Sequence, residues 1–171
     1  MMDYLRKAVA NQTILLLAVM TCINVLPANA SSINSADGKK LYSICAACHL
    51  SSAAGVAGMF PPLTDRLAEL VSKSAGRDYL VLVIDRGMSG RVTVNNTNYN
   101  GFMPAQGPAL GNEGIATVLN YLLEKFNADN LPQTWSIFSV DEVGAIKYRH
   151  NEISNQQLHR LREKAFSHTN E

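Results

Sequence analysis

Cysteine is scarce in this sequence, and its distribution excludes several common uses of thiols. Only three cysteines, Cys22, Cys45 and Cys48, occur among 171 residues. A structural zinc site takes four protein ligands, and no second cysteine pair is present to complete one. A thioredoxin-like dithiol belongs to a βαβ unit, and no such pattern surrounds Cys45 and Cys48. The chain therefore has neither a cysteine-rich framework nor a four-cysteine metal site.

An excess of charge of either sign is also missing. The chain has 15 Lys and Arg against 14 Asp and Glu, which gives a formal net charge of +1. Domains that bind nucleic acid through its phosphates carry a strong basic surplus. The balance therefore predicts no nucleic-acid partner. We expect protein partners to dock on a local surface patch rather than to be attracted by a net field.

No apolar run is long enough to span a membrane comfortably. The longest one covers thirteen residues, 14–26, whereas a membrane helix needs about 20. Two basic residues, Arg6 and Lys7, precede this run, and the small-residue sequence Ala28-Asn29-Ala30 follows it. This order is typical of a secretory signal peptide with its cleavage site.

Cleavage after Ala30 removes residues 1–30, and we expect the mature protein in the periplasm without stable membrane insertion. The removed segment takes Cys22 with it. Two cysteines then remain, and no thiol is left over for a separate structural disulfide. Lipidation of Cys22 is the alternative interpretation of this segment.

The rest of the chain fits one domain with an extension. We expect residues 31–126 to form the domain and the more polar residues 127–171 to form an extension with short helices. Trp135 and Phe138 are large apolar residues near the start of the extension. They are expected to hold it against the domain.

The chain contains one informative cysteine motif, Cys45-Ala46-Ala47-Cys48-His49. Two cysteines three apart with a histidine directly after the second form the attachment signature of c-type haem. Residues three apart share a helical face, so both thiols can form thioethers at one haem edge. His49 then supplies the first axial ligand of the iron. A disulfide or a chance match to the motif is the alternative.

The segment Phe60-Pro61-Pro62-Leu63 offers His49 a hydrogen-bond partner. Its two prolines favour an extended backbone with free carbonyl groups and few donors. A metal-bound histidine usually donates its second ring N–H to such an acceptor. We expect the acceptor to be the Pro61 carbonyl, with Pro62 next. A plain turn between helices is the alternative.

Three methionines beyond the signal peptide, Met59, Met88 and Met103, are candidates for the second axial ligand. Met59 is ten residues from His49, so its loop would have to wrap the haem edge tightly. Met103 is 54 residues downstream and precedes Pro104, which favours an extended conformation suited to a stiff loop. The pattern favours Met103. Met88 is the second candidate for the ligand. If it does not bind the iron, we expect it to pack in the core or to line the haem edge.

The other histidines, His150, His159 and His168, all lie in the polar extension. We expect them at the solvent-exposed surface. A haem with two histidine ligands, or a metal site in the extension, is the alternative that they leave open.

Hydrophobic periodicity predicts helices with one small hairpin. Helices are expected at residues 37–47, 64–74, 77–86, 112–126, 143–148 and 154–166, and the hairpin within residues 88–100. Thr64 or Asp65 is expected to cap the second helix, and Gly87 to end the third. A capping box from Ser139 to Glu142 precedes the fifth.

Together these residues resemble class I cytochromes c over roughly residues 35–126. The segments that carry the resemblance are Gly38-x-x-x-Tyr42-x-x-Cys45-Ala46-Ala47-Cys48-His49, Pro61-Pro62-Leu63, Gly101-Phe102-Met103-Pro104, and the helix with Ile115, Val118 and Tyr121.

The resemblance implies an all-α cytochrome c fold with one covalent haem c, a hairpin before the axial methionine, and a C-terminal helical extension. Its first and last core helices would cross near Gly38 and Tyr121. It implies coordination by His49 and Met103, and it includes Pro61, Leu63 and Tyr99 among the haem-binding residues.

Residues 87–94 and 99–105 make the resemblance more specific, because they point to particular groups of cytochromes c. They look like the cytochromes that are subunits or domains of periplasmic sulfite and alcohol dehydrogenases, or that are fused to copper nitrite reductases. This implies a periplasmic electron carrier, not an enzyme, whose partners are a redox donor and a redox acceptor. A tightly bound subunit of an oxidoreductase complex is the alternative. A five-coordinate haem sensor or enzyme is a third interpretation.

Overall fold

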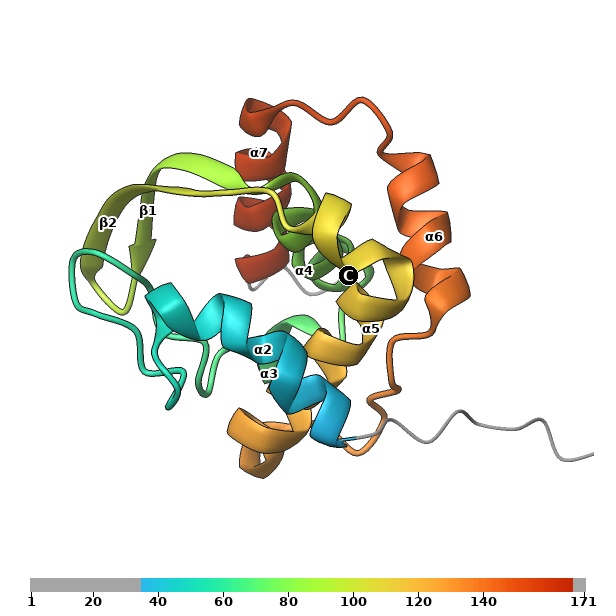
Figure 1. The fold of residues 1–171 in the computed structure, drawn as a ribbon. Coiled ribbons are helices and arrows are strands. Elements are labelled where there is room, and N and C mark those ends of the chain that lie inside the picture. The colour runs from blue at the N-terminus through green and yellow to red at the C-terminus, as the bar shows by residue number, and fades with distance from the viewer. Residues whose placement is uncertain (1–34, 168–171) are drawn as a thin grey trace, which may run out of the picture. The chain divides into compact units, whose positions relative to one another are not determined.

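The computed structural model describes residues 35–167, which form a helical fold with one small antiparallel sheet (Figure 1). The expected signal peptide, its cleavage site after Ala30 and His168 lie outside the described residues. No helix within residues 35–167 is both long and apolar enough to cross a membrane. The all-α class with a small hairpin, expected from the sequence, is confirmed.

Helix α2 (Ser35–His49) crosses helix α5 (Gly107–Phe126) at a glycine. A Cβ atom on Gly38 would lie 2.6 Å from the Cβ atom of Tyr121, closer than real side chains approach. The Tyr42 ring packs against Tyr121 at a centroid distance of 5.8 Å. The crossing implied by the family resemblance is confirmed, because only glycine allows these two helices to come so close.

Helix α3 (Leu67–Leu70) is a single turn, so the helix predicted at residues 64–74 is wrong in extent. Neither Thr64 nor Asp65 caps it, and the N-cap residue Arg66 makes no side-chain capping bond. Asp65 has a φ of +63°, a left-handed conformation through which a right-handed helix cannot run. The backbone there turns instead of starting a helix.

Helix α4 (Ser74–Arg86) begins three residues before its predicted start and ends at Gly87, as predicted. Its start is set by packing, because a Cβ atom on Gly76 would overlap the backbone of Leu70. Gly87 has a φ of +69° and a ψ of −177°, a combination that is essentially restricted to glycine.

Strands β1 (Met88–Val94) and β2 (Thr97–Met103) form the antiparallel hairpin, which extends three residues beyond its predicted end. Asn95 and Asn96 connect them with φ angles of +48° and +60°. Positive φ at both positions matches the natural twist of a two-residue hairpin. The register places Met88 opposite Met103, so both methionines lie at the open end of the hairpin.

Helix α5 begins at Gly107 rather than near residue 112. A proline in its first turn is well suited to a helix start. The backbone is then non-helical at Gly111, which has a φ of +61°, and the helix resumes beyond it. The predicted start is therefore where the main helix resumes. Its buried stripe includes the predicted Ile115, Val118, Leu119 and Leu122.

The extension contains a short 3-10 helix and two α-helices, η1 (Ala128–Asn130), α6 (Val140–Arg149) and α7 (Asn155–Phe166). Ser139 caps α6 by accepting a hydrogen bond from the Glu142 N–H at 3.0 Å. The Glu142 carboxylate bonds Arg77 of α4 at 2.6 and 2.7 Å. The predicted capping box is therefore half formed, and its other half ties α6 to α4.

Phe138 holds the start of the extension against the domain, as predicted. Its side chain is fully buried, and its backbone forms a reciprocal pair of hydrogen bonds, 2.8 and 2.9 Å long, with the amide of Asn120 on α5. Trp135 packs against the same core. Farther along, α7 lies beside α4 (Figure 1).

Candidate haem site

The two thiols of the motif lie on the last turns of α2. Cys45 and Cys48 are three positions apart, so they share one helical face, and both are partly buried and free of disulfide bonds. Burial is the main cause that raises the pKa of Cys45. This arrangement supplies two closely spaced thiols, as two thioether bonds to one porphyrin edge require.

His49 closes α2 and has one ring nitrogen committed to a hydrogen bond. Its Nδ1 lies 2.8 Å from the carbonyl oxygen of Pro61, the acceptor expected from the sequence. The side chain is 7 % exposed, and burial lowers the pKa of the imidazole, partly offset by the bond to Pro61. A neutral ring that donates through Nδ1 leaves Nε2 as the nitrogen for a metal.

The loop between His49 and Pro61 depends on a glycine that sequence reasoning did not single out. Gly55 has a φ of +66°, and its N–H bonds the His49 carbonyl at 3.0 Å. A Cβ atom there would lie 2.7 Å from the Pro61 carbonyl oxygen, the same atom that faces His49. The only available signal was a glycine in a loop rich in small residues, which is too common to identify this role.

Leu63 lies at the end of the same loop and packs against the core. Its carbonyl accepts a 3.0 Å hydrogen bond from the side chain of Asn127, which also contacts the backbone of Leu67 and Leu122. Asn127 is almost fully buried. Sequence reasoning placed it at the end of a helix and missed that it joins three segments.

Met103 is the last residue of β2, and it is half-buried against the core cluster. The backbone of Gly87 comes so close that a Cβ atom on Gly87 would lie 2.7 Å from the Ala105 nitrogen and would overlap the Met103 carbonyl. Just beyond, the Gln106 N–H bonds the Ile84 carbonyl at 2.8 Å. The end of α4 therefore fixes the loop that carries Met103.

The other two methionines have different surroundings. Met88 is buried, and its sulfur lies 3.8 Å from the hydroxyl of Tyr79. Met59 is 61 % exposed. Tyr99, on β2, is buried opposite Val92 of β1.

Helix α7 holds the outer edge of β1. The Ser89 N–H and carbonyl both bond the side-chain amide of Asn155, each at 3.0 Å. His159 Nε2 lies 2.8 Å from the same carbonyl, and Arg162 donates to the Thr93 carbonyl at 2.8 Å. The strand that pairs with the Met103 strand is therefore tied to a helix some 70 residues farther along the chain.

The histidines of the extension make specific contacts. His150 lies 2.9 Å from the Asp78 carboxylate, and His159 bonds Ser89. Both are half-buried, so the expectation of freely exposed surface histidines is wrong for these two. The reason is that the extension packs on α4 and β1, so each ring contacts a residue of one of those elements.

The residues at the end of α2 fit a haem c. Two thiols on one helical face and an adjacent imidazole, oriented through its other nitrogen, are the donor set of a covalently attached haem with a histidine ligand. Bound there, the group supplies a reversible one-electron change at iron. Cys45 and Cys48 would hold the porphyrin edge, and His49 would bind the iron.

Comparisons with known proteins agree with this site. Residues 35–125 match the family model for cytochrome c. The chain is 35 % identical over 127 residues to a cytochrome c-552 from one strain of Thermus thermophilus, covering 74 % of this chain and 84 % of that protein. It is 37 % identical over 123 residues to another Thermus thermophilus cytochrome c-552, covering 72 % of this chain and 92 % of that protein.

The fold and the motif thus define a c-type haem protein. The chain belongs to the cytochrome c family and carries one covalent haem c on Cys45 and Cys48.

Proposed function

We propose that this protein is a periplasmic mono-haem electron carrier in which His49 and Met103 are the two axial ligands. The observation that supports this most is the fixed position of Met103, at the end of a hairpin against which Gly87 packs without room for a side chain. An iron with both axial positions filled by the protein has no open site for a substrate. Electron transfer is then the chemistry that remains.

The surroundings of both proposed axial ligands favour rapid electron transfer. His49 is oriented by the Pro61 carbonyl, and the Met103 loop is anchored by the Gln106 bond to Ile84. Ligands held in this way change position little when the iron changes oxidation state. A methionine ligand also raises the reduction potential.

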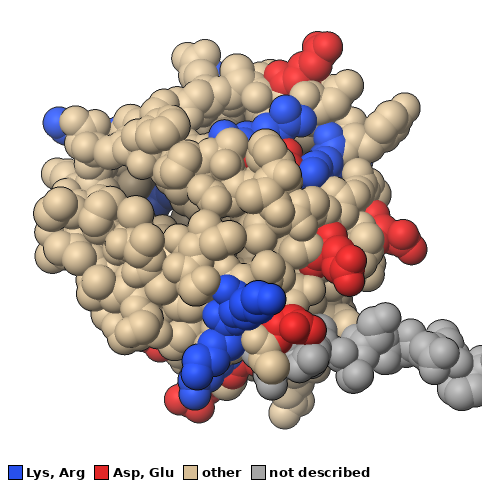
Figure 2. All heavy atoms as spheres, in the orientation of Figure 1, with Lys and Arg blue, Asp and Glu red and all other residues tan. Residues whose placement is uncertain are grey.

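An apolar surface near these residues suits brief docking of a redox donor or acceptor. Phe102, next to Met103, is 73 % exposed, and Met59 is 61 % exposed. The two segments are neighbours, because a Cβ atom on Gly101 would lie in ordinary van der Waals contact, 3.8 Å, with the Met59 carbonyl oxygen. Figure 2 shows few charged side chains on the hairpin side of this face. Transient redox contacts are small, so such a patch is sufficient.

We further propose a periplasmic dehydrogenase as the donor, and export through a signal peptide cleaved after Ala30. The narrower resemblance of residues 87–94 and 99–105 supports this donor class. In the alternative, a tightly bound oxidoreductase subunit, the extension would serve as a clamp for another protein. The extension is less available for that role, because Trp135 and Phe138 pack on this chain's own core.

Carbon monoxide binding by the reduced protein tests the closed iron site. We expect slow or negligible binding by the wild type and rapid binding by Met103→Ala, because the substitution opens one axial position. Met88→Ala is the matched control and should behave like the wild type. Rapid binding by the wild type would instead support the five-coordinate sensor or enzyme.

A further inference from the structure

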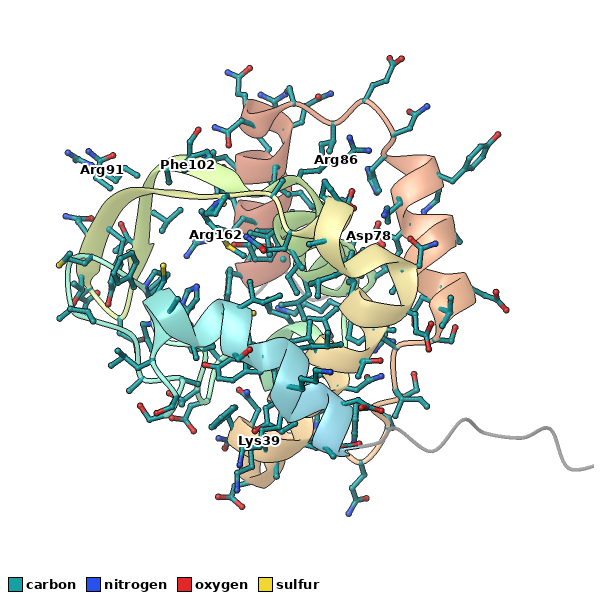
Figure 3. All side chains as sticks on the ribbon, in the orientation of Figure 1. Lys39, Asp78, Arg86, Arg91, Phe102 and Arg162 are labelled. Carbon is teal, nitrogen blue, oxygen red and sulfur yellow. The ribbon has the colours of Figure 1, made fainter. Side chains whose placement is uncertain are left out.

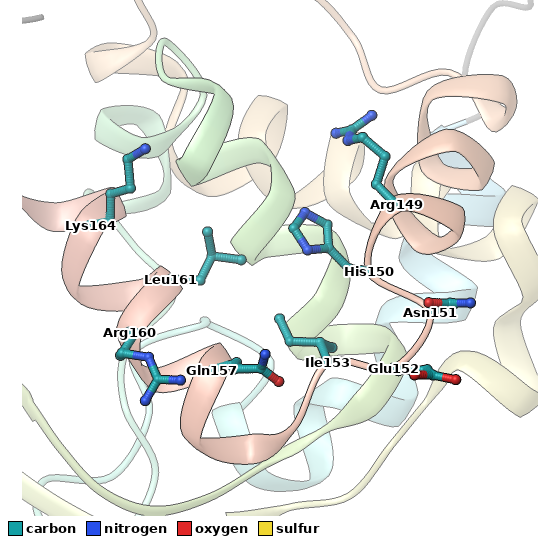
Figure 4. Close-up of a pocket in the computed structure, with 9 residues that line it drawn as sticks. All are labelled: Arg149, His150, Asn151, Glu152, Ile153, Gln157, Arg160, Leu161 and Lys164. Carbon is teal, nitrogen blue, oxygen red and sulfur yellow. The ribbon is translucent and has the colours of Figure 1, made fainter.

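The extension contains a pocket of about 520 Å³ between the end of helix α6 and helix α7 (Figure 4). It lies beyond residues 35–125, the part of the chain that matches the cytochrome c family model. Arg149, Arg160 and Lys164 bring three cations to its lining, and Glu152 is the single carboxylate among the described residues that line it. The pocket is therefore a basic site separate from the haem motif.

Helix α7 presents a stripe of side chains to this pocket, Gln157, Arg160, Leu161 and Lys164. Positions three and four apart share one face of a helix, so Arg160 and Lys164 are like charges on neighbouring turns. This arrangement is unfavourable in an isolated helix. Both residues are exposed, and Arg160 makes no ion pair or hydrogen bond within residues 35–167. That part of the fold therefore does not use the charge of Arg160.

Helix α6 contributes Arg149 and His150 from the other side of the pocket. Both are held by the Asp78 carboxylate of α4, at 2.7 Å from Arg149 and 2.9 Å from His150. A guanidinium has five N–H donors, and Arg149 gives one terminal nitrogen to Asp78 while its side chain stays 54 % exposed. Asp78 therefore positions Arg149 beside the pocket and leaves it donors for a ligand.

Positive charge remains in surplus when the neighbours of the pocket are included. Arg86 donates to the Asn151 carbonyl at 3.0 Å, and the buried Asp85 pairs with Arg86 at 2.9 Å and with Lys147 at 2.8 Å. Five cations thus surround three carboxylates: Arg86, Lys147, Arg149, Arg160 and Lys164 against Asp78, Asp85 and Glu152. Two positive charges are left without a carboxylate to balance them.

The interior of the pocket is apolar and offers hydrogen-bond donors. Ile153 and Leu161 are half-buried and pack against the core, and Figure 4 shows them at the centre of the site. Walls of low dielectric strengthen the field of the surrounding charges. The side-chain oxygen of Gln157 is bonded to Ser154 at 2.8 Å, which leaves its N–H groups available. Figure 4 also shows the Glu152 carboxylate directed away from this centre.

This site lies away from the hairpin. Figure 3 places Asp78 and Arg86, which contact residues of the pocket, toward α6, whereas Phe102 and Arg91 lie on the hairpin at the other side of the view. An anion in the pocket would therefore leave the exposed surface around Phe102 free for a redox partner.

We propose that the pocket between α6 and α7 binds a small anion with two linked phosphate groups. Arginine donates to phosphate through two parallel N–H groups, and lysine contributes a point charge. Because the cations stand on both helices, two linked groups can contact Arg149 on one side and Arg160 with Lys164 on the other. The inference goes beyond electron transfer and does not depend on which residues bind the iron.

Calorimetric titration of the haem-loaded protein with sodium pyrophosphate tests the site. Ionic strength is held constant with sodium chloride, so that general screening does not change during the titration. We expect saturable binding of one pyrophosphate, weakened at least about tenfold in the double variant Arg160→Gln/Lys164→Gln, because charge-assisted hydrogen bonds are lost.

The matched control is Lys39→Gln/Arg91→Gln, which also removes one lysine and one arginine from exposed positions but leaves the pocket intact. It should bind pyrophosphate like the wild type. Absence of saturable binding, or equal weakening in the two double variants, would overturn the site.

Two further measurements sharpen the result. If the double variant does not accumulate, Arg160→Gln alone decides, because Arg160 has no hydrogen bond or ion pair within residues 35–167 to lose. Weaker pyrophosphate binding by Arg160→Gln supports the site, and unchanged affinity rejects it. Orthophosphate should bind the wild type more weakly than pyrophosphate, and equal affinities would contradict a site for two linked groups.

Discussion

The His49 side and the Met103 side of the haem site differ in how far apart in the sequence their parts lie. The His49 side is local: the Pro61 carbonyl is 12 residues away, and the loop between them is closed by the Gly55 bond to His49. The Met103 side combines the end of α4, both hairpin strands and α7. Distant substitutions should therefore disturb the Met103 side first.

The largest effect is expected from the motif itself, which anchors both sides. Cys45→Ser or Cys48→Ser should strongly reduce covalent haem attachment, because one thioether bond is lost. Haem that stays on the chain in denaturing gels measures this. Cys22→Ser is the control and should retain full attachment if residues 1–30 are removed. Full attachment in Cys48→Ser would contradict the role of the motif.

Gly87→Ala should lower the free energy of unfolding by roughly 1–3 kcal/mol and weaken the Met103 side, because the backbone conformation of Gly87 is essentially restricted to glycine. The added methyl group also meets the Met103 backbone. We expect a lower unfolding midpoint and partial loss of methionine ligation in absorption spectra.

Gly58→Ala is the matched control for Gly87→Ala. Gly58 also has a positive φ, of +75°, but a Cβ atom there would meet nothing within 4 Å. We expect this variant to keep its methionine ligation. Equal loss of ligation in both variants would show that strain alone matters and that the contact with the Met103 loop does not.

Asn155→Ala tests the link from α7 to the hairpin. It removes two hydrogen bonds to Ser89, which together contribute about 1–2 kcal/mol. We expect the methionine ligand to be displaced at a lower temperature than in the wild type, with haem attachment unchanged. The exposed neighbour Gln156 provides the control Gln156→Ala, and identical behaviour of the two variants would exclude the link.

The smallest effect is expected from Ser139→Ala, which removes the cap of α6 and costs about 1 kcal/mol. Chemical denaturation should show this loss. The absorption bands of the haem should not change, because the cap lies at the opposite end of α6 from Lys147, which pairs with Asp85 at the end of α4. A spectral change would mean that the extension acts on the site as a whole.

The sequence predicted the His49 side in detail because that side is built from short-range patterns. The motif on α2 and the extended prolines each have a direct physical meaning in a single sequence. The crossing at Gly38 and Tyr121, in contrast, was implied by the family resemblance. The pairing of His49 with Pro61 could therefore be predicted from the segment that contains both.

On the Met103 side, the sequence predicted the ligand itself but not the contacts that hold it in place. Asn155, Arg162 and the second role of Gly87 depend on which segments meet in space, and no local pattern encodes that. The extent of α3 was wrong for a similar reason. The sequence predicted a cap at Thr64 or Asp65 and a helix to residue 74, but the backbone at Asp65 is left-handed and the helix ends at Leu70.

The central claim is that Met103, and not Met88, closes the iron site opposite His49. The near-infrared absorption of methionine-bound ferric haem, measured in the wild type, Met103→Ala and Met88→Ala, tests it most directly. We predict the band in the wild type and in Met88→Ala, and its complete loss in Met103→Ala with haem still attached. A band that persists in Met103→Ala and disappears in Met88→Ala would contradict the account.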